Sequence, residues 1–130
     1  MSGWDRIRRA AAGQGDPWHR MMHSLSENGF PDSQAELDTG HKMWVFHQGD
    51  VPHPATQMPP GYNVHVWHPN MLDTHGNTNL SAHLGQDPDQ VGPLLRRMFA
   101  HPQAMRHLYG QMQGDPGLGN TYLDMTQEQR

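Results

Sequence analysis

Two short segments in the middle of the chain, residues 43–47 and 63–68, are rich in aromatic and β-branched residues, which is typical of β-strands. The loop between them holds four prolines and two glycines. At about fourteen residues it is longer than a hairpin needs, and loops of that length are often functional. Residues 80–84 alternate apolar and polar side chains, which indicates a third, weaker strand. The middle of the chain therefore predicts a small antiparallel sheet of two or three strands, with a long Pro/Gly-rich loop between the first two.

Helical patterns flank the predicted sheet on both sides. Asp16 and Pro17 form a start signal, with Asp16 as the N-cap, and Gly29 fits a left-handed stop. Between them an apolar face follows the i, i+3, i+4, i+7 spacing of a helix: Trp18, Met21, Met22 and Leu25. Further helices are expected at residues 3–12, after the Asp-Pro pair at 87–88, and in a last segment with the apolar face Met105, Leu108, Tyr109 and Met112. These patterns predict the α+β class, with helices N-terminal and C-terminal to the sheet.

The domain organisation follows from length and composition. A chain of 130 residues buries roughly two-thirds of its unfolded surface, which is enough for one core. We therefore predict a single α+β domain over residues 1–113. Residues 114–130 are mostly glycine, polar and charged residues, and we predict an extended or flexible C-terminal tail there. Its scattered apolar residues would dock on a partner: Leu118, Tyr122, Leu123 and Met125.

Composition argues against several classes of function. Cysteine is absent, which excludes disulfides, thiolate metal sites and cysteine nucleophiles. The net charge of −4 does not favour binding to nucleic acid. No window approaches the ~18 consecutive apolar residues of a membrane span, and the N-terminus has no apolar run of signal-peptide length. We therefore expect a soluble, cytoplasmic protein that does not engage a membrane.

Histidine is unusually frequent, with 11 residues in the chain. The densest group of histidines and aspartates runs through the predicted strands and their loops: His47, Asp50, His53, His65, His68, Asp73 and His75. Its candidate metal ligands are His47, Asp50, His65, His68 and His75. Side chains i and i+2 of a strand share a face, so His65 and His68 would point to opposite faces. A cross-strand pair of ligands would form if His47 lay opposite His65 or Asn63. Such a set suits a divalent transition metal such as Zn²⁺, although nothing in the sequence requires a cofactor.

Three aromatic residues near the predicted sheet, Trp44, Tyr62 and Trp67, are candidates for a binding surface, with core packing as the alternative. The phosphate-binding loops and the serine nucleophile elbow are absent, so the sequence favours a binding or assembly protein. It would act through contacts with a partner protein or with its own copies. The alternative is a His/Asp metal-dependent hydrolase of phosphoesters or nucleotides, served by the histidine cluster. A pH-responsive module is a third hypothesis, because unperturbed histidine titrates near ~6.5.

Overall fold

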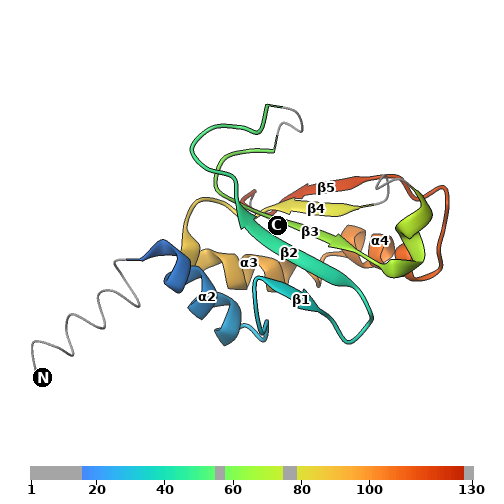
Figure 1. Cartoon of the computed structure of the whole chain (residues 1–130), viewed down its shortest axis with the longest axis horizontal. Coiled ribbons are helices and arrows are strands. Elements are labelled where there is room, and N and C mark those ends of the chain that lie inside the picture. Colours follow the sequence, from blue (N-terminus) through green and yellow to red (C-terminus); the bar gives the residue numbers. More distant parts are fainter. Residues whose placement is uncertain (1–15, 55–57, 75–78, 128–130) are drawn as a thin grey trace, which may run out of the picture.

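The computed structural model describes residues 16–54, 58–74 and 79–127, which form a five-stranded sheet with helices on one side (Figure 1). The helix predicted at residues 3–12 lies outside the described residues. The strands are β1 (Gln34–Glu36), β2 (Lys42–His47), β3 (Tyr62–Trp67), β4 (Leu80–His83) and β5 (Thr121–Asp124). The helices are α2 (Pro17–Glu27), α3 (Val91–Met98) and α4 (Pro102–Met112), with the 3₁₀ helices η2 (Pro69–Thr74) and η3 (Pro88–Gln90).

The sheet is larger than the sequence predicts, and it is mixed. The α+β class is confirmed, but five strands in the order β1-β2-β3-β4-β5 replace the predicted two or three. β1 to β4 pair antiparallel, whereas β5 lies parallel to β4 after a crossover through α3 and α4. β1 has only three residues, and β5 lies in a segment of mostly glycine, polar and charged residues, so neither strand stands out in the sequence. The long Pro/Gly-rich loop lies between β2 and β3, the strands that correspond to the first two predicted.

The segment predicted as an extended or flexible tail, residues 114–130, contributes an integral strand. β5 pairs with β4 in the register Leu80↔Thr121 and Ala82↔Leu123. Leu123 and Met125 are 8% and 1% exposed and belong to the same core as the other strands. A short edge strand is sufficient for this, because Leu123 within β5 and Met125 directly after it both reach the core. The predicted boundary at residue 113 therefore falls inside the folded unit.

Local signals in the sequence account for α2. The Asp16 side chain accepts a hydrogen bond from Trp18 N, and Pro17 opens the helix, as predicted. At the other end Gly29 has φ +91°, and Phe30 N donates to Leu25 O over 2.9 Å, which is the Schellman end. Met21 and Leu25 are fully buried. The helix therefore begins and ends where its capping residues require.

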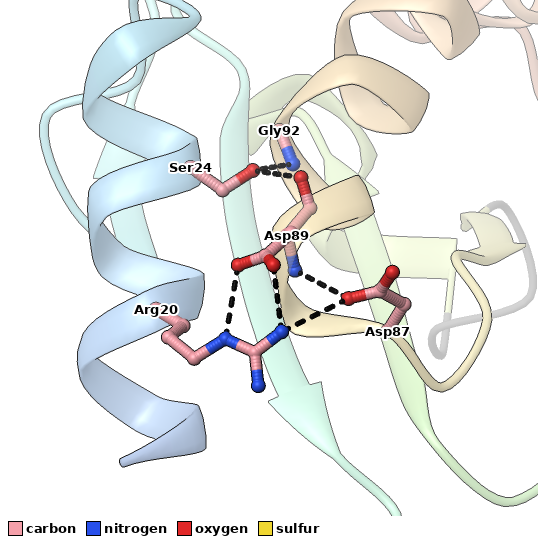
Figure 2. Close-up of polar contacts among 5 residues, drawn as sticks. All are labelled: Arg20, Ser24, Asp87, Asp89 and Gly92. Atoms are coloured by element: carbon pink, nitrogen blue, oxygen red, sulfur yellow. Dashed lines mark hydrogen bonds and ion pairs between the residues drawn. The ribbon is translucent and has the colours of Figure 1, made fainter. Parts of the chain in front are cut away.

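α2 is held against the start of α3 by a set of polar contacts (Figure 2). Arg20 forms two parallel hydrogen bonds with the Asp89 carboxylate, of 3.1 and 2.6 Å. The Ser24 hydroxyl donates to Asp89 O over 3.0 Å and accepts from Gly92 N over 2.8 Å. This contact requires a glycine at 92, because a Cβ atom there would lie 2.1 Å from Ser24 O. The two helices thus touch backbone to backbone.

The core lies between the sheet and the helices. One side of the central strands is buried, including Met43 and Val45 of β2, Val64 and Val66 of β3, and Leu80 and Ala82 of β4. The alternation of a strand puts the next residues, such as Trp44 and His65, on the opposite side. Within the described segments, no helix is both long enough and apolar enough to cross a membrane.

α4 is oriented differently from its sequence pattern. Of the predicted apolar face, Leu108 is buried, while Met105, Tyr109 and Met112 are 52%, 65% and 38% exposed. The helix instead buries Ala104, His107 and Gln111. Gln111 Nε2 donates to Val66 O of β3 over 3.1 Å. This hydrogen bond to the sheet helps to hold α4 with most of its apolar stripe facing outward.

Candidate functional site

The side of the sheet opposite the helices is here called the open face. It carries a row of aromatic rings. His65 of β3 lies between Trp44 of β2 and Ser81 of β4 in the register of the sheet. Ser81 in turn lies beside Tyr122 of β5. Phe46 packs against both neighbours: its ring centroid is 5.1 Å from that of Trp44 and 5.2 Å from that of His65, and it stacks on the latter at 23°. Trp44 and Tyr122 remain 45% and 46% exposed. The open face therefore offers flat rings to a ligand or partner.

The β2–β3 loop contacts the same face. Asn63, on the open face of β3, donates from Nδ2 to Pro59 O over 2.9 Å. Its Oδ1 lies 3.0 Å from His83 Nδ1, across to β4. Met58, next to Pro59, is only 9% exposed. The loop that the sequence marks as functional by its length thus provides a wall beside the sheet.

A pocket of about 360 Å³ lies between this loop and the strands. Met58 and Pro59 form its apolar side. Its remaining lining is polar or aromatic and comes from β3, β4, β5 and their ends: His65, Asn79, Ser81, Asn120, Thr121 and Tyr122. The His65 and Ser81 side chains are hydrogen bonded over 2.7 Å, and Asn120 Oδ1 accepts from Asn79 N over 3.0 Å. Its volume is at the low end of the ~300–1,000 Å³ typical of small-molecule sites.

No side chain that lines the pocket carries a charge at neutral pH. Burial lowers the pKa of His65 below its ordinary value, so that the imidazole stays neutral. Burial, and after it the nearby Asp124 carboxylate, raise the pKa of Tyr122 to about 12, so that its hydroxyl keeps its proton. The pocket therefore presents hydroxyl, amide and imidazole groups to a ligand and offers no partner for a formal charge.

The three aromatic residues predicted as a binding surface divide between the two sides of the sheet. Trp44 and Trp67 lie on the open face. Tyr62 lies on the helix side, is 3% exposed, and makes an edge-on contact with His47 at 4.7 Å between ring centroids. Tyr62 thus takes the core-packing alternative. The sequence did not single out the pocket residues Ser81, Asn79 and Asn120, and only the alternation at 80–84 placed Ser81 on a polar face.

The residues predicted as metal ligands lie at separate places. His47 pairs with Tyr62, not with His65 or Asn63. His68 packs edge-on against His41 at 4.9 Å, and its Nε2 donates to Thr39 O. Asp50 is exposed in the β2–β3 loop, and His75 lies outside the described residues. In the part of the chain that the structure describes, no three histidine, aspartate or glutamate side chains are placed to hold one ion. The metal site stays a prediction without support from this geometry.

A second candidate surface lies beside α4. Its outward stripe borders an apolar groove of about 300 Å³. The β1–β2 connection forms one wall of the groove with Leu37, Thr39 and His41. The α4 side is formed by Phe99, Met105, Leu108, Tyr109 and Met112. His41, one of these lining residues, is 1% exposed. The groove and the exposed stripe together form one continuous surface, here called the α4 surface.

His41 joins the β1–β2 connection to α4 as a neutral ring. Its Nε2 lies 3.1 Å from Leu108 O, and because a carbonyl only accepts, this nitrogen carries the proton. Its Nδ1, 2.6 Å from Thr39 Oγ1, then accepts from the hydroxyl. Burial lowers the pKa of His41, and the nearby His68 and His107 act in the same direction.

We expect the protein to lose stability as the pH falls below about 6.5. A histidine whose pKa is lowered by folding binds its proton more readily in the unfolded chain, so the unfolding free energy rises with pH through that range. His41→Gln removes one such group, and its unfolding free energy should fall less steeply between pH 7 and 5 than that of the native protein. Chemical denaturation at several pH values measures the slope, and comparison at pH 8 isolates the lost contacts. Parallel curves for the two proteins would contradict this role of His41.

Comparison of the chain with protein-family models, with curated proteins and with solved structures finds no match.

Proposed function

We propose that the protein is a binding and assembly protein that associates with a second copy of itself through the α4 surface. The observation that carries this proposal is the outward orientation of the α4 stripe. A helix that buries His107 and Gln111 while exposing Met105 and Tyr109 reverses the usual distribution of polar and apolar side chains. A contiguous exposed apolar patch on a small protein marks an interaction site more often than an accident of packing.

The shape of the α4 surface favours a second copy as the partner. A two-fold symmetric contact brings the same patch of both chains together, so the patch must complement itself. The α4 surface contains both a protruding ring, Tyr109 at 65% exposed, and an apolar groove of about 300 Å³ beside it. A two-fold axis near α4 would place Tyr109 of each chain over the groove of the other.

The charge of the surface supports the same partner. None of the residues that line the groove is an aspartate, glutamate, lysine or arginine, and the lowered pKa of His41 keeps that ring neutral. Two identical patches can therefore meet without placing like charges opposite each other. The 11-residue helix α4 is about 16 Å long. A contact area built on so short a helix is smaller than the roughly 800 Å² per partner of a standard interface. We therefore expect a reversible dimer whose population depends on concentration.

Sedimentation velocity over a range of protein concentrations tests this proposal. The native protein should shift from monomer to dimer as its concentration rises, and Tyr109→Ser should stay monomeric at concentrations where the native protein is dimeric. Tyr122→Ser is the matched control, because it removes another exposed tyrosine ring from the opposite side of the sheet. It should associate like the native protein. A native protein that stays monomeric, or two variants that weaken association equally, would overturn the proposal.

A further inference from the structure

The pocket on the open face lies on the other side of the sheet from α4, and the proposed self-association does not use it. We propose that this pocket and the ring row beside it bind a neutral carbohydrate. The inference rests on two properties of the site: a lining that is rich in hydroxyl and amide groups but carries no charge, and the flat rings that continue out of it.

Hydrogen-bonding capacity without charge is the first property. A sugar presents several hydroxyl groups, each able to donate and to accept, and these are best matched by side chains that can also do both. Asn79 and Asn120 supply amides near the ends of β4 and β5, and Ser81 supplies a hydroxyl between them and His65. The two titratable side chains of the lining are also neutral at pH 7, because the pKa of His65 is lowered and the pKa of Tyr122 is raised. A phosphate or carboxylate ligand would meet no lysine or arginine in this lining.

Flat apolar surface is the second property. The carbon–hydrogen side of a pyranose ring is apolar and packs on aromatic faces, which bury large area at low conformational cost. Tyr122 lines the pocket and is 46% exposed. Phe46 and Trp44 continue the surface beyond His65 toward β2. With strands about 4.8 Å apart, the row from β2 to β5 spans roughly 14 Å. It therefore has room for more than one sugar ring.

Nucleic acid is the ligand class that most resembles this one, since bases also stack on rings of an exposed sheet. Such sites combine the rings with a positive groove that follows the phosphates. The strands that carry the ring row contribute one lysine, Lys42, beside Glu36 in the β1–β2 register, and no arginine. The net charge of the chain is −4. The electrostatics therefore favour an uncharged polyhydroxylated ligand.

Nuclear magnetic resonance titration of the full chain tests the inference. The probes are neutral glucose, galactose, mannose and xylose with their short β- and α-linked oligomers, each to tens of millimolar, with uridine and adenosine monophosphate as comparison ligands. At least one neutral sugar should shift the amide signals of Ser81, Thr121 and Tyr122, and its longer oligomers should bind more tightly. The signals of α4 should not move.

Variants distinguish this site from a general surface effect. Tyr122→Ser and Asn120→Ala should each weaken the binding of the best sugar at least about tenfold. Tyr109→Ser, which serves here as the control, should bind the sugar like the native protein. The inference is overturned if no sugar of the panel shifts the pocket signals, if the nucleotides bind there and the sugars do not, or if the pocket variants bind unchanged. Because association is tested by Tyr109 and sugar binding by Tyr122, the two proposals fail separately.

Discussion

Replacing Gly92 by alanine is expected to lower the free energy of unfolding by about 3 kcal/mol, at the upper end of the usual cost of overpacking. The added Cβ atom would lie 2.1 Å from the backbone oxygen of Ser24 and 2.6 Å from Asn28 Nδ2. The first of these obstacles is the backbone of α2 and cannot rotate away. α2 and α3 would have to separate, which would also stretch the hydrogen bond from Gly92 N to the Ser24 hydroxyl.

Gly110→Ala is the matched control, because Gly110 also lies inside a helix of the same domain. A Cβ atom there would meet Leu118 Cδ1 at 2.7 Å, the far end of a flexible side chain that can move aside. Alanine also favours a helix over glycine by about 1 kcal/mol, so we expect a net change within about 0.5 kcal/mol. Urea denaturation followed by tryptophan fluorescence measures both variants. Equal losses at the two positions would show that backbone contact between α2 and α3 is not what Gly92 preserves.

Met125→Ala is expected to cost 2–5 kcal/mol of unfolding free energy, which is the range for truncating a buried long side chain. Met125 is 1% exposed and packs in the core that the helices and the sheet share. Its backbone N donates to His83 O over 2.9 Å, which extends the pairing of β5 with β4. Much of the stability of a small domain, commonly ~5–15 kcal/mol, would be lost through one residue near the C-terminus.

Tyr122→Ser provides the comparison for Met125→Ala, since it changes a large side chain of the adjoining strand β5 that is 46% exposed. Its cost should stay near or below about 1 kcal/mol. Thermal and urea denaturation of the two variants decide whether the C-terminal segment is part of the folded unit. A Met125→Ala protein as stable as the native chain would restore the interpretation of residues 114–130 as a tail.

Local signals were enough to predict some elements and not others. α2 is predicted correctly because Asp16, Pro17 and Gly29 lie next to the backbone that they cap. The i, i+3, i+4, i+7 spacing identified the apolar stripe of α4, but a stripe does not say which side of a helix meets the core. That choice depends on Gln111 reaching Val66 and His41 reaching Leu108, contacts between residues far apart in sequence. β1 was missed because three residues show no period, and β5 because the residues around it are mostly glycine, polar and charged.

The candidate site depends on strand register, which a single sequence does not contain. Placing Ser81 beside His65 requires the antiparallel register of β3 and β4, and placing Tyr122 beside Ser81 requires the parallel register of β4 and β5. The sequence did mark the long β2–β3 loop and the aromatic residues Trp44 and Trp67. The sequence did not show that this loop and these aromatic residues lie on the same side of the sheet as Tyr122 of β5. β5 begins some forty residues after β4, roughly the length of a βα crossover unit.

The parallel position of β5 also affects how the protein completes its fold during synthesis. Chains emerge from the ribosome N-terminus first, so β1 to β4 and the three helices are available before residues 121–124 exist. Until then one edge of β4 presents unpaired backbone groups next to Leu80 and Ala82, the kind of apolar edge that recruits strands from other chains. α3 and α4 lie between the two strands in sequence, so no local hairpin can protect that edge. The β4 edge of a newly made chain is therefore open to strands of other chains until residues 121–124 have been made and pair with it.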